Sequence, residues 1–157
     1  MEQLLSLLKM NARMSLEDLA LATNQSVEGV ASQIEHLEKK QVIAGYTTVL
    51  DTTKLEPRPV TAWIEVKMNP KKDFGFDYLV DTLLTFEEVE SVYLMAGDYD
   101  LAVVVSGTDL MEVSMFVSRK LATLDSVVST ATHFVLQKYK DSGFNLKKDQ
   151  DLRENMI

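Results

Sequence analysis

Apolar residues recur at helical spacing in three short runs within the first 40 residues, with polar gaps between the runs. The run over residues 2–10 predicts a short amphipathic helix that carries four leucines (Leu4, Leu5, Leu7 and Leu8). The second run follows Ser15 and the third follows Ser26. Each serine is a candidate N-cap, because its hydroxyl can accept a hydrogen bond from a free backbone N–H group. Three short helices with this spacing predict a helix-turn-helix and therefore a DNA-binding head.

After the three predicted helices the pattern becomes typical of strands. Residues 41–50 are rich in β-branched and aromatic side chains, with Gly45 as a bend. Residues 51–59 are polar and contain two prolines, which is typical of a linker. The sequence thus predicts a head over residues 1–50, a linker over 51–59 and a second domain that begins at residue 60.

Residues 60–141 alternate between strand-like and helix-like segments. Strands are expected at 60–68, 89–95, 99–106 and 129–140, and helices at 76–84 and 110–121. Asp109 is a candidate N-cap, and Glu112 stands three residues later, as in a capping box. The order β-α-β-β-α-β is that of the ferredoxin-like fold, so we expect an α+β protein. Residues 142–157 form a polar tail.

The strands of this second domain are too apolar for a sheet with one bare face. Trp63 alternates with Ala62 and Ile64 and therefore lies on the opposite face of its strand, while residues 101–105 are apolar on both faces. A sheet that is apolar on both sides needs a second cover. The simplest cover is the same sheet of a second copy, which places Trp63 at a dimer interface. The alternative is that the β-rich run of the head folds back over the sheet.

Composition sets the broad class of the protein. With 157 residues and 46% apolar side chains, the chain can build one domain or two small ones. It contains no cysteine, which excludes disulfides and thiol chemistry. Neither a secretory signal nor a membrane-spanning apolar stretch is apparent, so we expect a soluble cytoplasmic protein.

The charge of the chain bears on DNA binding. The net charge is −8 and the pI is about 4.7. Within residues 1–50 the lysines and arginines are outnumbered by the acidic residues (Lys9, Arg13, Lys39 and Lys40 against Glu2, Glu17, Asp18, Glu28, Glu35 and Glu38). Because a DNA-binding head usually neutralises phosphates with a basic patch, we expect weak binding per head and dependence on several heads acting together.

The third helix is the expected reading element of the head. Its exposed positions should face the major groove, with two lysines near phosphates (Ser26, Gly29, Ser32, Gln33 and His36, then Lys39 and Lys40). An equally good reading of the two lysines is that they complement the negative C-terminus of their helix.

Several motifs together resemble the Lrp/AsnC family of bacterial and archaeal regulators. They are Asn11-Ala-Arg13, Ser26-Val-x-x-Val30, Val42-Ile-x-Gly-Tyr46 and Gly97-Asp-Tyr-Asp-Leu101, and the resemblance spans residues 3–140. It implies a winged helix-turn-helix and a ligand-sensing domain that dimerises through its sheets. It also implies assembly into tetramers or octamers, with small effectors, usually amino acids, bound between dimers. Gln33 and Gln41 stand where the family often has a basic residue and usually a glycine.

The same resemblance implies the residues that contact the effector. They lie at the turn before the third strand and on the last strand (Gly97, Asp98, Tyr99, Asp100, Thr130 and Thr132). A carboxylate of the turn can accept the ammonium group of an amino acid, while backbone N–H groups hold its carboxylate. Without the resemblance, the Gly-Asp pair is ordinary hairpin-turn chemistry.

The residues offer little for catalysis. His36 and His133 each lack a helix-spaced partner for a metal site, and neither a phosphate-binding loop nor a catalytic triad is apparent. We therefore expect no catalytic residue, no metal site and no cofactor. An enzyme would have to use Asp98 and Asp100 to hold Mg²⁺.

The sequence thus predicts an effector-responsive transcription regulator. Its expected partners are double-stranded DNA, a small molecule such as an amino acid, and further copies of itself. The alternative is a small-molecule sensor or scaffold whose helix-turn-helix has lost strong DNA affinity.

Overall fold

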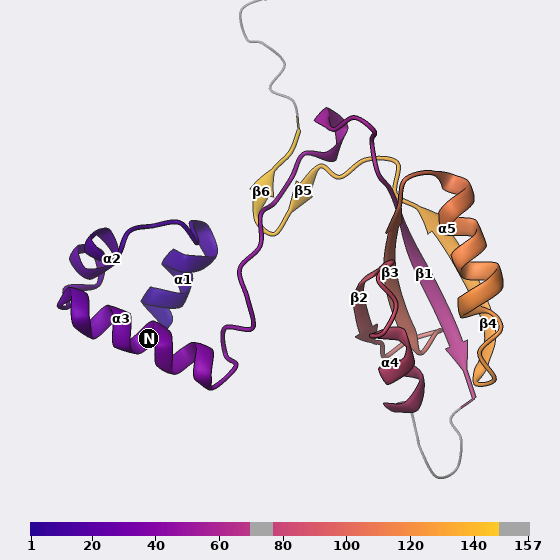
Figure 1. Cartoon of the computed structure of the whole chain (residues 1–157), viewed down its shortest axis with the longest axis horizontal. Coiled ribbons are helices and arrows are strands. Elements are labelled where there is room, and N and C mark those ends of the chain that lie inside the picture. The colour runs from indigo at the N-terminus through magenta and orange to yellow at the C-terminus, as the bar shows by residue number, and fades with distance from the viewer. Residues whose placement is uncertain (70–76, 148–157) are drawn as a thin grey trace, which may run out of the picture. The chain divides into compact units, whose positions relative to one another are not determined.

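The computed structural model describes residues 1–69 and 77–147 (Figure 1). The chain divides into two compact units. Met1–Leu50 together with Lys140–Leu146 form the first, and Asp51–Tyr139 make up nearly all that is described of the second. The helix start expected at Phe76 and most of the tail expected over 142–157 lie outside the described residues. No helix within the described ranges is long and apolar enough to cross a membrane.

The first unit contains the three helices expected from the sequence, α1 (Glu2–Met10), α2 (Leu16–Thr23) and α3 (Val27–Lys39). Leucines of α1 and α2 pack with the inner stripe of α3 in one core (Leu4, Leu8, Leu19, Ala20, Val30 and Leu37). Both predicted N-caps are confirmed. Ser15 Oγ accepts from Asp18 N at 3.1 Å, and Ser26 Oγ accepts from Gly29 N at the same distance. A tight turn joins α2 to α3, so this unit has the helix-turn-helix arrangement.

Both α2 and α3 end at a residue in the left-handed backbone region. Asn24 closes α2 at φ 53°, a conformation that asparagine tolerates well. Gln41 follows α3 at φ 56°. There Gln41 N donates to Glu38 O and Val42 N donates to Leu37 O, both at 2.9 Å, which is the Schellman pattern. Glycine is the residue that this position favours, and glutamine occupies it with backbone strain.

The β-rich run over residues 41–50 forms no strand in the described structure, contrary to the expectation. A strand needs a neighbour for its N–H and C=O groups, because an isolated extended chain gains no ladder hydrogen bonds. The strand propensity of this run is therefore not sufficient without a partner.

The second unit holds a four-stranded antiparallel sheet with the order β2-β3-β1-β4. Its strands are β1 (Val60–Met68), β2 (Val89–Leu94), β3 (Leu101–Gly107) and β4 (Val127–Phe134). Helix α4 (Asp77–Leu83) follows β1, and α5 (Leu110–Phe116), extended by the π-helical turn η2 (Val117–Leu121), follows β3. This arrangement confirms the predicted ferredoxin-like α+β fold.

Both helices of this unit pack on the same face of the sheet. Ala62, Ile64 and Val66 of β1 are fully buried, and α4 contributes Leu79 and Leu83 to the same core. The predicted cap of α5 is also present, because the Asp109 side chain accepts from Glu112 N at 2.8 Å. The Glu112 carboxylate bonds to Thr108 N rather than to the N-cap residue itself.

Several strand bounds differ from the expectation: β2 ends at Leu94 instead of residue 95, β3 covers Leu101–Gly107 instead of 99–106, and β4 begins at Val127 instead of residue 129. Strand β4 ends at Phe134 instead of residue 140, because its neighbour β1 begins at Val60 and offers no partner beyond Thr61, whose carbonyl accepts from Val135 N. The chain then forms a small hairpin of β5 (Lys140–Asp141) and β6 (Phe144–Asn145) where a polar tail was expected. Its turn residues have positive φ, Ser142 at 47° and Gly143 at 92°, as two-residue hairpins require.

The segment expected as a linker, 51–59, is tied to the second unit. It carries the short 3-10 helix η1 (Thr52–Lys54), whose first turn is capped by the Asp51 side chain. Further along, the Arg58 guanidinium donates to the Leu136 carbonyl at 2.6 Å.

The positive φ of Gln41 can be tested by its effect on the stability of the head. Gln41→Gly removes the strain of a side chain at positive φ and should raise the free energy of unfolding of the head by about 1 kcal/mol. Urea unfolding followed by far-UV circular dichroism measures this change. Asn24→Gly is the matched control and should be nearly neutral, since asparagine already suits φ 53°. A Gln41→Gly variant no more stable than the parent contradicts the left-handed assignment.

Candidate nucleic-acid interface and effector site

The predicted DNA-contacting residues lie along α3 and its end. Ser26, Ser32 and His36 are exposed, whereas Gly29 and Gln33 are half-buried. The separations of three, four and seven residues between Gly29 and Ser32, Gln33 and His36 place all four on one face of the helix. Helix α3 therefore presents these four residues on one face.

Gln33 differs from its exposed neighbours. Its Oε1 atom is buried and has no hydrogen-bond partner among the described residues. A buried acceptor left unpaired costs about 1–3 kcal/mol. The side chain as a whole is half-buried, so part of it remains exposed to solvent.

The two lysines at the end of α3 have different surroundings. Lys39 Nζ lies 2.6 Å from Glu35 Oε1, and both side chains are well exposed. The hydrogen bond and the positive charge of Lys39 hold the pKa of the Glu35 carboxyl below its ordinary value. Lys40 is exposed and forms no ion pair within residues 1–69 and 77–147. Of the two, Lys40 is the cation with its charge unpaired.

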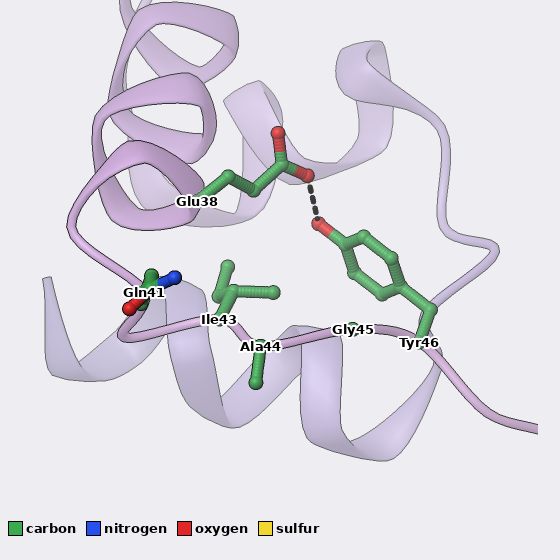
Figure 2. A pocket seen from close by; sticks show the side chains of 6 residues that line it. All are labelled: Glu38, Gln41, Ile43, Ala44, Gly45 and Tyr46. Atoms are coloured by element: carbon green, nitrogen blue, oxygen red, sulfur yellow. Dashed lines mark hydrogen bonds between the residues drawn. The ribbon is translucent and has the colours of Figure 1, made fainter.

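A hollow of about 580 Å³ lies between the last turn of α3 and the segment that follows it. Figure 2 shows that Tyr46 turns back toward Glu38, while Ala44 points away from it. The Tyr46 hydroxyl donates to Glu38 Oε1 at 2.8 Å. Partial burial and this hydrogen bond to a carboxylate raise the pKa of the Tyr46 hydroxyl above 10.0, its ordinary value. The contact attaches the segment after α3 to the helix. In the sequence, this contact was indicated only by the motif Val42-Ile-x-Gly-Tyr46, which contains the tyrosine.

The predicted effector residues of the turn lie between β2 and β3. Gly97 and Asp98 are exposed, and Tyr99 and Asp100 are half-buried. A Cβ added at Gly97 would meet no atom within 4 Å, so the backbone of this turn is open to an approaching molecule.

Asp100 makes several bonds within the chain. Its Oδ2 accepts from Met68 N at 2.8 Å, its N–H donates to Val66 O at 3.0 Å, and its carbonyl accepts from Met95 N at 2.8 Å. One residue therefore closes the turn and fixes it to the end of β1.

The structure brings the predicted effector residues of the last strand to the same end of the sheet. Thr130 pairs with Val66 across β1 and β4, and Thr132 pairs with Ile64. Because Asp100 N also bonds to Val66 O, Asp100 and Thr130 lie on either side of the same residue of β1. Thr132 lies two residue pairs farther from the turn along the ladder.

The face of the sheet opposite the helices carries the predicted interface residue. Trp63 is half-buried and stacks on Tyr93, with ring centroids 6.0 Å apart and an interplanar angle of 17°. On the same face His133 Nε2 lies 3.4 Å from Glu65 Oε1. The sequence did not reveal the Trp63–Tyr93 contact, because these residues lie on strands separated by β3.

The sequence predicted no metal site. In the described parts of the chain, no group of three or more histidine, aspartate and glutamate side chains could hold a metal ion. The Asp100 carboxylate, which an enzyme would need for Mg²⁺, already accepts from Met68 N.

Comparison with known proteins identifies the family. The Lrp/AsnC ligand binding domain matches residues 61–143. YugG of Bacillus subtilis, an uncharacterized HTH-type transcriptional regulator, is 47% identical over 142 residues, which cover 90% of this chain and 86% of that protein. The chain belongs to the Lrp/AsnC family. Its second unit is the ligand-binding domain of that family, and its first unit is the helix-turn-helix of a transcription regulator.

More distant Lrp/AsnC proteins agree over nearly the whole chain. The leucine-responsive regulatory protein of Haemophilus influenzae is 25% identical over 146 residues, covering 93% of this chain and 87% of that protein. The feast or famine regulatory protein of Mycobacterium tuberculosis, solved with L-methionine, superposes with a TM-score of 0.74 at 23% identity, covering 93% and 96% of the two chains. This likeness supports the fold.

The raised pKa of Tyr46 gives a test of its contact with Glu38. The folded head holds the phenol proton more tightly than the unfolded chain, so the contribution of Tyr46 to stability is complete below pH 10.0 and declines as the pH rises above it. The difference in absorbance at about 295 nm between the parent and Tyr46→Phe, followed with pH, should show a tyrosinate midpoint above 10.0.

Glu38→Gln is the matched control for this titration. It removes the negative charge next to the phenol, and the Tyr46 midpoint should move down toward the ordinary value. A parent midpoint that Glu38→Gln leaves unchanged rules out the contact.

Proposed function

We propose that this protein is an amino-acid-responsive transcription regulator that binds DNA through α3 in an oligomer assembled by its second unit. The observation that carries the proposal is the joining, in one chain, of a capped helix-turn-helix to a ferredoxin-like ligand-binding domain with an open aromatic face. Each part supplies one property, namely DNA contact, effector binding or assembly.

The DNA-binding part of the proposal rests on α3. Its exposed polar side chains Ser26, Ser32 and His36 match the small and polar groups that read base edges, and Lys40 is available for a phosphate. With Lys39 paired to Glu35, one head offers few phosphate contacts. Two heads related by a two-fold axis would bind half-sites about one helical turn apart and gain affinity through their linkage.

The assembly part rests on the open sheet face. Helices α4 and α5 cover the opposite face, while Trp63 and Tyr93 lie stacked on this one with Val104 paired beside Trp63. A second copy that packs its own sheet face to face would bury these aromatic rings. Trp63 is then a dimer-interface residue.

The effector part rests on the turn between β2 and β3. Asp98 offers an exposed carboxylate for an ammonium group, and the backbone at Gly97 is accessible for an α-carboxylate. Two structural neighbours, from Mycobacterium tuberculosis and Neisseria meningitidis, were solved with L-methionine. An amino acid bound at this turn between dimers is the effector that this chemistry favours.

A second candidate function is supported by the charge of the head. Acidic residues outnumber basic ones over residues 1–50, and one of the lysines is paired within its own helix. A sensor or scaffold whose head binds DNA weakly is consistent with this balance.

A gel shift distinguishes the two functions. The full chain is tested on the DNA upstream of its own coding region, with and without each of the twenty amino acids. A specific shift that one amino acid strengthens or weakens supports the regulator. A chain that binds this DNA no better than unrelated DNA supports the sensor or scaffold.

Gln33→Arg tests whether α3 is the reading element. The arginine stem can follow the half-buried path of Gln33 while its guanidinium reaches the groove. Affinity should rise, and the slope of log K against log salt should become steeper by about one unit for one added phosphate contact. Fluorescence anisotropy with labelled DNA measures both.

Gln137→Arg is the matched control for this measurement, because it adds the same charge on an exposed residue outside the helix-turn-helix. It should leave the slope unchanged. If Gln33→Arg behaves like Gln137→Arg, α3 does not contact DNA.

Trp63→Glu tests the face-to-face dimer. A carboxylate on the interface would be buried without a partner, so the variant should become monomeric in light scattering. Trp63 is also the single tryptophan of the chain. Its emission should therefore shift to the red when the parent protein is diluted into the monomer range.

Met111→Glu on the exposed outer side of α5 is the control, because it places the same charge on the helix side of the domain. It should remain at least dimeric. A Trp63→Glu variant that forms the same dimer as the parent contradicts the proposed interface.

A further inference from the structure

Gln41 carries a long side chain at a backbone conformation that glycine and asparagine adopt more readily. Its φ is 56°, just after the last turn of α3. The residue is exposed, and Figure 2 shows its amide group without a bond to the other residues that line the hollow. Within residues 1–69 and 77–147 this amide group has no hydrogen-bond partner. No contact inside the chain therefore offsets the strain, and a strained exposed residue is a candidate for contact with a ligand.

The backbone on either side of Gln41 is fully engaged. The N–H groups of residues 40–43 all donate to carbonyl groups of α3, at 2.9–3.2 Å (Lys40 to His36, Gln41 to Glu38, and both Val42 and Ile43 to Leu37). An anion that meets this end of the helix must therefore be bound by side chains.

Lys40 and Gln41 supply side-chain donors at this place. The C-terminus of a helix carries partial negative charge, and the Glu38 carboxylate adds to it, so an anion approaches only where donors offset this field. Lys39 contributes little, because Glu35 holds its ammonium group. Lys40 is exposed and forms no ion pair in the described part of the chain. Gln41 adds two neutral N–H donors directly beside it.

We propose that the Gln41 amide donates a hydrogen bond to a DNA phosphate beside the one that Lys40 binds. This inference rests on the proposed function, in which α3 enters the major groove. The exposed face of such a helix meets the base edges, and its far end can contact the phosphate backbone. Glutamine is one of the side chains that contact phosphates in protein–DNA complexes. The contact fixes the end of α3 on the DNA without reading the sequence.

A neutral donor and a cation have different effects on the salt dependence of binding. Lys40 releases counterions from the DNA, so Lys40→Met should reduce the slope of log K against log salt by about one unit for each head that binds. Gln41 releases none. Gln41→Gly should therefore weaken binding by about threefold for each head, or about tenfold when two heads engage, and should leave the slope unchanged.

The stability of the variants separates loss of the contact from loss of the fold. Gln41→Gly also removes the backbone strain, so the head should become more stable while it binds DNA more weakly. Damage to the fold would lower both. Gln41→Glu is the second variant, because it keeps the length of the side chain and the strain. Its carboxylate cannot donate and repels a phosphate, so it should bind more weakly than Gln41→Gly.

Fluorescence anisotropy of the full chain at several salt concentrations measures these effects. The probes are the DNA upstream of its own coding region and an unrelated duplex of the same length. A phosphate contact carries no sequence information, so Gln41→Gly should lose the same factor on both duplexes. Gln137→Glu is the matched control, because it adds the same charge on an exposed residue outside the helix-turn-helix. It should bind like the parent protein.

The inference is supported if Gln41→Gly binds both duplexes more weakly at an unchanged slope and Gln41→Glu more weakly still. It is overturned if both variants bind like the parent. It is also overturned if Gln41→Gly reduces the slope as much as Lys40→Met, because Gln41 would then act only by placing Lys40. A loss on the upstream DNA alone overturns it too, since Gln41 would then read a base.

Failure of the proposed function gives a different result. A parent protein that binds both duplexes equally well contradicts the regulator, and the two Gln41 variants still decide whether the amide contacts a phosphate. A parent protein that binds neither duplex overturns both the regulator and the phosphate contact.

Discussion

The architecture of the second unit depends on the alternation of strand β1, which pairs on both edges. Its inner residues Ala62, Ile64 and Val66 lie in the core, and its outer residues Trp63 and Glu65 lie on the open face. A register slip of one residue would exchange these two sets. It would place the Glu65 carboxylate in an apolar core, and an unpaired buried charge costs several kcal/mol. The helix-covered face, the open face and the position of the β2–β3 turn are therefore fixed by the same alternation.

Local signals were enough to predict most elements. Helices α2 and α3 each begin after a serine whose hydroxyl caps the first turn, and Asp109 does the same for α5. The β-α-β-β-α-β order followed from periodicity alone, because switches between the two spacings mark the element boundaries. The failures lie where the outcome depends on a neighbour. Strand β4 stops where β1 offers no partner, and the run over residues 41–50 is paired with none of the described strands.

In the candidate site, too, contacts between residues close in the sequence could be predicted, whereas contacts between distant residues could not. The pairing of Lys39 with Glu35 follows from their i,i+4 spacing and is visible in the sequence. The bond from Met68 N to Asp100 joins residues 32 positions apart, and its existence depends on where β3 happens to begin. No local pattern distinguishes Asp98 from Asp100, since both flank Tyr99 in the same turn. Only the register of β1 against β3 shows which carboxylate is occupied.

The acidic charge of the chain places a physical condition on the proposed regulation. A head with few free cations gains little from phosphate neutralisation, so we expect the binding of one head to DNA to be weak. Linking two heads raises the apparent affinity by about 10²–10⁴ when both can engage at once. Effector coupling in proteins is typically about 1–3 kcal/mol, a factor of roughly 5–150. A change of that size has little effect on a head that is saturated by its own affinity. It changes DNA occupancy strongly when occupancy depends on how the heads are assembled. Weak contact per head and control through assembly are therefore consistent properties of one protein.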